Sequence, residues 1–404
     1  MTRANSNLLR ERGGKEDNKV TFVELFFDLV FVFAVTQLSH SLLEHLTLAG
    51  VVQTTLLLLA IWWAWIDTSW VTNWLDPERI PVRLMLFGLM LAGLLLSVSI
   101  PQAFGPRALV FAGAYACMQV GRCLFMLWAL RGHSPTSVQN FQRITAWLTL
   151  SSLFWVAGGF AGESVRISLW TLALFLETLA PAVGYWTPGL GRSNTADWDV
   201  EGRHMAERCG LFVIIALGES ILVSGAKFAG LPWTAEVVAA FVVAFLSAVT
   251  MWWIYFNIGA ETASQRITDS SDPGRIARLA YTYMHLPLVA GIIVVAVGDE
   301  LVLAHPTGDT DTKTAAVLLG GPALYLFGNL LFKRETANRP TLSHMVGLGL
   351  LVLLIPVSPF VQPLGLSVLA TLVLVVVAVW ETLSLGGGKR EAQARSARGD
   401  KPAG

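Results

Sequence analysis

Long apolar runs alternate along the sequence with short polar segments that carry charge, Pro or Gly. Crossing the apolar core of a bilayer takes roughly 20 helical residues, and the runs have about this length. Twelve runs follow the pattern, covering residues 20–42, 48–70, 80–100, 107–130, 142–162, 165–187, 205–226, 233–258, 276–303, 313–333, 341–358 and 362–385. The pattern predicts an all-α integral membrane protein with about twelve transmembrane helices.

The amino-acid composition excludes several classes of protein. Charged residues make up 14% of the chain and hydrophobic residues 54%, against roughly 25% charged residues in ordinary globular proteins. The 28 basic and 28 acidic residues cancel, so no overall basic field attracts nucleic acid. Cys117, Cys123 and Cys209 lie in apolar runs without metal-ligand spacing. We therefore expect membrane lipids as partners, and no nucleic acid, disulfide, metal site or cofactor.

The distribution of Lys and Arg predicts the orientation in the membrane. With the N-terminus inside, the cytoplasmic segments hold 23 of the 28 basic residues, and the opposite side holds four. Cytoplasmic loops carry the excess of positive charge, so both termini are expected in the cytoplasm. Residues 1–19 then form a polar tail without a signal-peptide pattern. Residues 386–404, rich in Gly, Lys, Arg and Ala, are expected to be disordered.

Several local patterns recur in the same order in the two halves of the chain. The pairs are Trp62–Asp67 with Trp252–Asn257, Gly121–Phe125 with Gly328–Phe332, and Glu177–Leu179 with Glu381–Leu383. They predict a duplication into six-helix repeats at 20–187 and 205–385, joined by a cytoplasmic linker at 188–204. Six spans are an even number, so both repeats enter from the same side and are parallel. This arrangement favours a transporter or channel.

Two segments carry a resemblance to a known family. Val20–Val35, which reads VTFVELFFDLVFVFAV, and Glu207–Ile221, which reads ERCGLFVIIALGESI, resemble the signature segments of the bacterial low-temperature-requirement A (LtrA) family. Tyr283–Pro287 fits the same resemblance, which covers nearly the whole chain. The resemblance implies a multi-pass protein of the bacterial inner (plasma) membrane, named after a growth requirement and not after a reaction.

Ionisable residues inside the apolar runs are the candidate site residues, because each costs free energy unless it has a partner, water or a function. Glu24 and Asp28 are four residues apart on the first run and share a helix face. Arg208 and Glu219 are eleven apart on the seventh run and also share a face. We expect these two faces to line one cavity. Further candidates come from the other runs: Asp67, Arg122, Glu177, His285 and Glu381.

Structural roles compete with functional ones for several of these residues. Near the cytoplasmic interface, Glu24 is expected to pair with Arg79, and Glu207 with Arg275. Arg122 should neutralise Asp28, Glu177 or Glu219. His285 fits a buried core residue better than a proton relay, whereas Asp67, Glu177 and Glu381 leave both roles open. The tryptophans and tyrosine in the duplicated Trp-rich pattern fit an interfacial belt better than a cation cage.

The deep acids Asp28, Glu177, Glu219 and Glu381 outnumber the deep base Arg122, and an acidic interior suits a cation or proton. The leading hypothesis is a transporter or channel that moves a small solute or cation through an acid-lined cavity between the repeats. One alternative is a membrane-embedded enzyme acting on a lipid or other hydrophobic substrate. Another is a stress-response protein that transports nothing. The sequence leaves open whether the chain forms a homo-oligomer.

Overall fold

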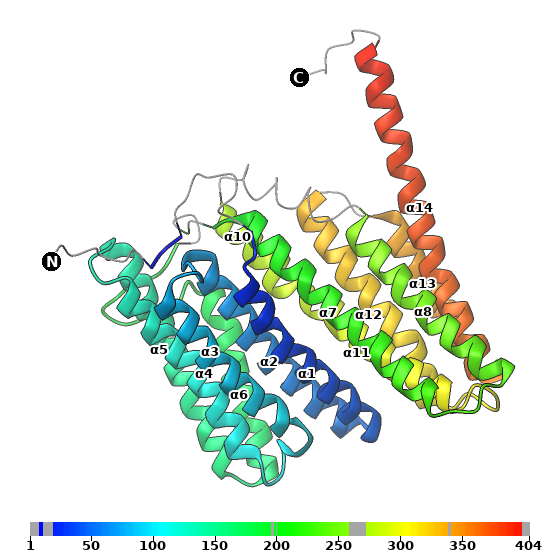
Figure 1. Cartoon of the computed structure of the whole chain (residues 1–404), viewed down its shortest axis with the longest axis horizontal. Coiled ribbons are helices and arrows are strands. Elements are labelled where there is room, and N and C mark those ends of the chain that lie inside the picture. Colours follow the sequence, from blue (N-terminus) through cyan, green and yellow to red (C-terminus); the bar gives the residue numbers. More distant parts are fainter. Residues whose placement is uncertain are drawn as a thin grey trace. The chain divides into compact units, whose positions relative to one another are not determined.

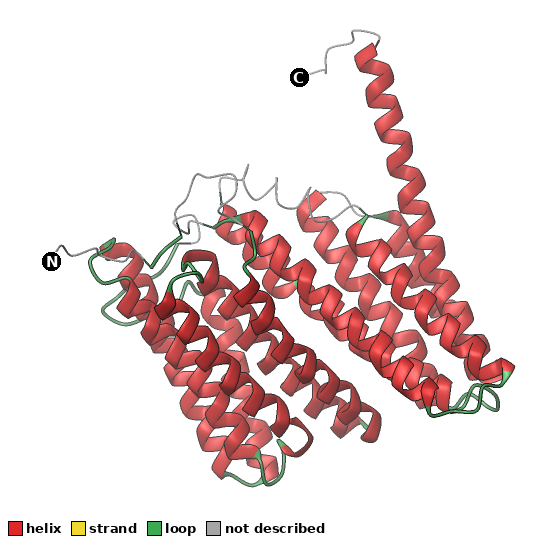
Figure 2. Cartoon of the chain, viewed as in Figure 1, coloured by secondary structure: helices red, strands yellow, loops and turns green. Residues whose placement is uncertain are grey.

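The computed structural model describes residues 8–10, 19–194, 198, 200–257, 272–337 and 341–397. Within these residues all regular secondary structure is helical, and no strand is present (Figure 2). Eleven helices in this part of the chain are long and apolar enough to cross a membrane. The prediction of a multi-pass helical membrane protein is confirmed at this level.

The helices follow the chain in the order shown in Figure 1. The first six are α1 Phe22–Glu44, α2 Leu48–Trp74, α3 Ile80–Ser99 with the short η1 Ile100–Gln102, α4 Ala108–Ala129, α5 Pro135–Phe160 and α6 Glu163–Ala182. The remainder are α7 Gly202–Ala229, α8 Ala235–Phe256, α10 Pro273–Ala277, η3 Arg278–Tyr283, α11 His285–Ala304, α12 Thr312–Ala337, α13 Leu342–Leu354 with η4 Ile355–Phe360, and α14 Pro363–Ala397.

All twelve predicted spans have a helix, although two helices depart from the expected bounds. Helix α5 begins at Pro135, seven residues before the predicted run. Its first turns include Asn140 and Arg143, and α5 is not among the eleven helices that are long and apolar enough to cross a membrane. Helix α14 continues to Ala397, through part of the tail expected to be disordered. The Lys, Arg, Glu, Gln and Ala residues of this segment are good helix formers. Residues 398–404 lie outside the described residues.

The chain forms two compact units. Unit 1 comprises Met1–Glu219 and Glu261–Leu286, and unit 2 comprises Ser220–Ala260 and Pro287–Gly404. Helix α7 therefore contributes its first part to unit 1 and the rest to unit 2, so these units differ in composition from the repeats expected at 20–187 and 205–385. In unit 1, α1 packs on α2 and α3, and α4 and α5 pack on each other and on α3 and α6 respectively. In unit 2, α12, α13 and α14 pack on one another, and α8 packs on α14.

Local sequence fixes how the helix that carries Glu24 and Asp28 begins. The Thr21 hydroxyl accepts a hydrogen bond from the Glu24 amide, and the Glu24 carboxylate accepts one from the Thr21 amide. This reciprocal capping box satisfies two amide groups that would otherwise lack a partner at the start of α1. The capping box thus orients the Glu24 carboxylate at the start of α1.

The duplicated Trp-rich pattern has a different environment in each unit. Trp62, Trp63 and Trp65 of α2 are buried, so these rings do not form the interfacial belt expected from sequence. Trp252 and Trp253 of α8 are 45% and 43% exposed, which suits lipid-facing positions. The first copy of the pattern instead supplies hydrogen-bond donors to the protein interior.

Candidate functional site

A ladder of acidic and basic side chains joins α1 to α7 in unit 1. Glu24 and Asp28, one turn apart on α1, face His204 and Arg208, one turn apart on α7. All four side chains are fully buried. We call these four residues the charge ladder. It brings together three of the sequence-predicted site residues, Glu24, Asp28 and Arg208.

The inner rung is the Asp28–Arg208 ion pair. Arg208 Nη1 and Nη2 lie 3.0 and 2.9 Å from the two carboxylate oxygens of Asp28. Trp65 Nε1 donates a further hydrogen bond of 2.8 Å to Asp28 Oδ1, and Ser69 Oγ accepts from Arg208 Nε at 3.3 Å. The guanidinium also lies 5.6 Å from the centre of the Trp65 ring. Each buried charge is therefore paired and hydrogen-bonded, as a stable buried ion pair requires.

The outer rung is the Glu24–His204 pair. The amide of Asn73 is oriented by the Glu201 N–H, which donates to Asn73 Oδ1 at 3.0 Å. Asn73 Nδ2 lies 3.2 Å from His204 Nδ1, and Arg10 Nη2 lies 3.2 Å from His204 Nε2. This nitrogen is 2.8 Å from Glu24 Oε1. The arrangement places an imidazole and a carboxylate, two groups that can exchange a proton, in hydrogen-bond contact.

Arg10, in the polar tail predicted from sequence, completes the outer rung. Its Nη2 lies 3.0 Å from Glu24 Oε2, and its Nε donates to the Thr72 carbonyl at 2.8 Å. Backbone hydrogen bonds of 2.8 Å from the Arg10 amide to the Trp74 carbonyl, and from the Asp76 amide to the Leu8 carbonyl, hold this segment to the end of α2. The expected Glu24–Arg79 pair is wrong. Arg79 instead contacts Asp76, three residues earlier in its own loop.

Glu207, the residue aligned with Glu24 in the second repeat, lies beside the ladder but outside it. It forms an ion pair with Arg203 one turn earlier at 3.3 Å, and its other oxygen accepts from the Val20 amide. Both side chains of this pair are partly exposed.

A second polar network joins α2 to α4 in unit 1. Arg122 Nη2 lies 3.2 Å from Asp67 Oδ2, and its Nη1 donates to Thr68 Oγ1 at 3.0 Å. Gln119 donates to the same Asp67 oxygen at 3.0 Å and also accepts from Arg122. The expectation that Arg122 neutralises Asp28, Glu177 or Glu219 is therefore wrong. Asp67 on the adjacent helix is its acidic partner.

Glu177 of α6 continues this network without a basic partner among the described residues. Tyr115 and Ser151 donate short hydrogen bonds to its two oxygens, and Trp155 Nε1 donates at 3.1 Å. Gln119 Nε2 links Tyr115 back to the Asp67 carboxylate. Glu177 thus joins α4, α5 and α6 through hydrogen bonds.

Glu381 has a comparable position in unit 2. Its carboxylate lies 2.7 Å from Lys333 Nζ on α12 and 3.4 Å from His344 Nδ1 on α13. Lys333 also donates to the Ile254 carbonyl at 2.9 Å. Glu177 on α6 and Glu381 on α14 therefore each contact the two preceding helices of the chain. Two of the four deep acids selected from sequence therefore have a basic partner, because Arg208 pairs with Asp28 and Lys333 pairs with Glu381.

Glu219 is the deep acid with the fewest contacts. It is buried, it lies near Thr36 and His40 of α1, and its Oε1 has no hydrogen-bond partner in the described part of the chain. Its neighbour Ser220 donates to Asp299 of α11 at 3.1 Å within unit 2. Asp299 is a buried acid that the sequence analysis did not select.

His285 closes a widened helical turn. Residues Arg278–Tyr283 form a π-helix, a rare geometry that is frequent at functional sites. His285 Nδ1 lies 2.8 Å from the Ala280 carbonyl, five residues earlier, and Trp62 Nε1 donates to the Thr282 carbonyl at 2.7 Å. His285 is fully buried. Its contacts are those of a core residue that satisfies the backbone of this turn.

The sequence analysis missed His204, one of the four ladder residues, and Arg10, which contacts Glu24. His204 precedes Arg208 by four residues, the same spacing that separates Glu24 from Asp28. That matched spacing on two helices is the signal that could have identified His204 as a partner. Arg10 had no such signal, because it lies in a polar segment far from any apolar run.

Comparison with known proteins agrees with the resemblance of the two signature segments. The family model described as bacterial low temperature requirement A protein (LtrA) matches residues 19–379. The uncharacterized protein RA0937 of Rhizobium meliloti (strain 1021) is 44% identical over 383 residues, which cover 93% of this chain and 92% of the relative. No solved structure matches the chain. The family match includes both helices of the charge ladder, and the chain belongs to the bacterial low temperature requirement A family.

Proposed function

We propose that the protein is a proton-coupled transporter of the bacterial inner membrane, in which the charge ladder takes up and releases the coupling proton. It moves a small solute across a membrane in which both termini face the cytoplasm. The observation that carries the proposal is the complete burial of Glu24, Asp28, His204 and Arg208 in two adjoining rungs.

Energetics favour a functional role for this ladder over a purely structural one. Buried ion pairs stabilise a protein little more than apolar residues of the same volume, because both charges lose their hydration. Ionisable groups inside a membrane are accordingly rare, and in transporters they act as proton relays. The Glu24–His204 rung has the parts that such a relay needs, namely a carboxylate and an imidazole in hydrogen-bond contact.

The pairing of acids and bases favours a coupled solute over a simple cation channel. Asp28, Asp67 and Glu381 each have a basic partner, so these carboxylates do not form a continuous acidic lining. A protonation step on Glu24 or His204 would instead change the charge balance with Arg10 and Arg208. Such a change can shift a two-state equilibrium between packing arrangements.

The same proposal includes two parallel six-helix repeats. Its support is the comparable position of Glu177 on α6 and Glu381 on α14, each on the last helix of its expected repeat and each in contact with the two helices before it. Even-numbered repeats of this kind are common in transporters.

The test is proton movement in proteoliposomes that contain the purified protein and a pH-sensitive dye inside. Potassium, sodium and a defined mixture of amino acids, organic acids and sugars are added outside in turn. We expect solute-dependent internal acidification with the wild type. We expect its loss in the His204→Gln and Asp28→Asn variants, and its retention in Arg203→Gln, a partly exposed neighbour of the ladder.

Two results would overturn the proposal. One is absence of proton movement from folded wild-type protein under every gradient and with every solute. The other is movement that the ladder variants retain at wild-type rates. Release of a chemically changed lipid from the vesicles would favour the membrane-embedded enzyme instead.

A further inference from the structure

Asp299 of α11 is a buried acid of unit 2 that has no part in the charge ladder. It is 5% exposed and lies five residues before the end of α11 at Ala304. The Ser220 hydroxyl on α7 donates a hydrogen bond of 3.1 Å to Asp299 Oδ2. Among the described residues this is the one polar contact of the carboxyl group, so Asp299 has a single donor and no base.

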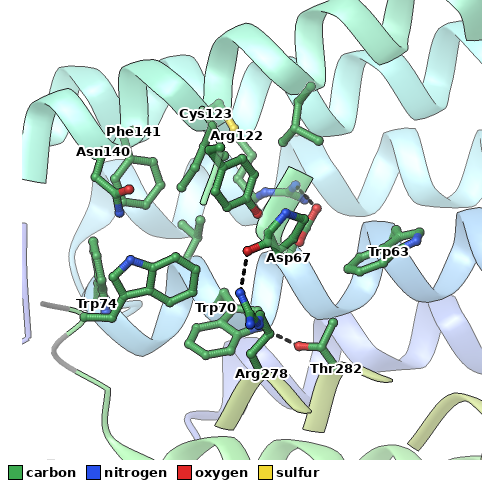
Figure 3. A pocket seen from close by; sticks show the side chains of 16 residues that line it. Trp63, Asp67, Trp70, Trp74, Arg122, Cys123, Asn140, Phe141, Arg278 and Thr282 are labelled. Carbon is green, nitrogen blue, oxygen red and sulfur yellow. Dashed lines mark hydrogen bonds and ion pairs between the residues drawn. The ribbon is translucent and has the colours of Figure 1, made fainter. Parts of the chain in front are cut away.

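The other deep acids have more partners. An arginine or lysine neutralises three of them, namely Asp28, Asp67 and Glu381. Arg122, the base beside Asp67, lines the same aromatic pocket of unit 1 as that acid (Figure 3). Glu177 has no described base but accepts hydrogen bonds from three donors. None of these arrangements is available to Asp299 within the described part of the chain.

Charged residues near Asp299 in the sequence of the two helices have partners of their own. Glu300, the next residue of α11, forms an ion pair with Lys227 of α7 at 3.5 Å. Glu219, the residue before Ser220, lies near His40 in unit 1. No charged side chain among the described residues lies close enough to act on Asp299. Its charge is therefore not balanced by the protein.

Helix α12 brings only apolar side chains to this part of α11. Val317 and Leu318 lie against Gly298, the residue before Asp299. An ionised carboxylate in apolar surroundings without a partner costs so much free energy that the group takes up a proton instead. The surroundings of Asp299 therefore favour the neutral acid.

A metal cation fits this position less well than a proton. Hard cations in proteins take about six or more oxygen ligands, whereas Asp299 and Ser220 supply one carboxylate and one hydroxyl. Ser224 lies one turn further along the same face of α7, but its hydroxyl is enclosed and forms no hydrogen bond with Asp299. A proton needs a single acceptor oxygen, and Asp299 Oδ1 accepts no hydrogen bond from the described residues.

Polar groups connect Asp299 with the surface of unit 2. Asp299 is 5% exposed, and the side chains of the adjoining Glu300 and its partner Lys227 are 16% and 37% exposed. Lys227 lies two residues before the end of α7 at Ala229. A proton can therefore reach the acid from this end of the two helices.

We propose that Asp299 is a proton-binding site of unit 2, which holds an exchangeable proton at neutral pH. The proton is on Oδ1, and Ser220 donates to Oδ2, the carbonyl oxygen of the neutral acid. The inference goes beyond the proposed function, which assigns the coupling proton to the charge ladder, and it does not depend on transport.

Infrared spectroscopy of the purified full-length protein in detergent tests the proposal. A neutral carboxyl group absorbs at a higher frequency than a carboxylate, and its band shifts when deuterium replaces the proton. At neutral pH we expect a carboxyl band in the wild type that shifts in heavy water and is absent from Asp299→Asn. Glu300→Gln, which removes the adjoining ion-paired acid, is the matched control and should lose carboxylate absorption only.

Two serine variants test whether the band belongs to the geometry at Asp299. Ser220→Ala removes the hydrogen bond to the carbonyl oxygen, so we expect the band to move to higher frequency. Ser224→Ala removes a hydroxyl without a described partner on the same face, and it should leave the band in place. Both variants keep Asp299, so they remain informative if Asp299→Asn fails to fold.

Thermal unfolding in detergent gives a second measurement. Asparagine has nearly the shape of the neutral acid, so Asp299→Asn should keep the unfolding temperature of the wild type at neutral pH. Asp28→Asn, which leaves Arg208 without its acid, should lower it.

Three results would overturn the inference. Loss of a carboxylate band in Asp299→Asn would show that the acid is ionised. A carboxyl band that does not shift in heavy water would show a sealed, purely structural proton. Disappearance of the band on addition of sodium or potassium chloride would assign the site to a metal cation. Because no gradient or solute is involved, these results are independent of the flux experiment on the ladder.

Discussion

Arg208 uses all three of its guanidinium nitrogens in the charge ladder. They contact both Asp28 oxygens, the Glu24 carbonyl and the Ser69 hydroxyl. The planar, forked guanidinium matches this set of acceptors, whereas a lysine ammonium group would reach only part of it. Replacement of Arg208 by lysine therefore preserves the charge and still disrupts the rung.

Removing one partner of the inner rung should destabilise the protein far more than removing both. Arg208→Met leaves Asp28 as a buried charge without a cation, and we expect a loss of about 3–5 kcal/mol in the free energy of unfolding. In the double variant Asp28→Leu/Arg208→Met the inner rung holds no unpaired buried charge, so most of this loss should be recovered. Denaturant unfolding in detergent measures the free energy of unfolding of the single and the double variant.

The matched control is Arg203→Met, which removes a partly exposed arginine five residues earlier. An exposed ion pair contributes only about 0–1 kcal/mol, so this variant should unfold like the wild type. Equal losses in the single and double variants would show that Arg208 stabilises α7 by packing and not by pairing with Asp28.

At the scale of elements, glycines allow α11 and α12 to approach closely in unit 2. A Cβ atom added at Gly291 would lie 2.4 Å from the Tyr325 backbone nitrogen, and one at Gly328 would lie 2.5 Å from that of Leu288. Neighbouring backbone cannot move aside like a flexible side chain. Small residues at helix crossings are the usual means of close packing in membranes.

Gly291→Ala should therefore lower stability even though alanine is the better helix former. Overpacking typically costs about 1–3 kcal/mol, which exceeds the gain in helix propensity. Gly320→Ala on α12 is the control, because an added Cβ there meets no atom within 4 Å. We expect a lower unfolding temperature for the first variant and an equal or higher one for the second. The reverse order would refute the packing argument.

The helices were predictable because a membrane enforces them. In the apolar core every backbone group must find its partner within the segment, so an apolar run of sufficient length becomes a helix. Polar residues within a helix weaken this signal, as the first turns of α5 show with Asn140 and Arg143. Helices can also continue past the run, as α14 does to Ala397.

Which charged side chains pair across two helices was far less predictable than the helices themselves. Choosing among acids for Arg122 depends on the rotation and register of α4 against its neighbours, which one sequence does not contain. Residues at the ends of runs were also discounted. Lys333 lies at the very end of a predicted span, where a basic residue is expected to face the cytoplasm, although it is buried against Glu381. Arg10 was discounted for a similar reason, since it lies in a polar tail.

At the scale of the whole molecule, the orientation can be tested with single cysteines in a variant that lacks Cys117, Cys123 and Cys209. Cysteine at Arg107 or Lys313 should react with a membrane-impermeant maleimide in intact cells. Cysteine at Arg192 or Arg203 should react only after the membrane is opened. These positions follow from the excess of basic residues on the cytoplasmic side. The opposite labelling pattern would invert the proposed topology.

The charge ladder also has a consequence for how the protein is made. Glu24 and Asp28 are synthesised 180 residues before His204 and Arg208, with which they pair. At ordinary translation rates of about 5–20 residues per second, α1 waits roughly 10–40 s for these bases. During that interval two acids make the helix a poor candidate for stable insertion into lipid. We expect chains truncated before Gly202 to be degraded faster in pulse-chase experiments than chains truncated after Ala229, because the charge ladder is completed only once α7 has emerged.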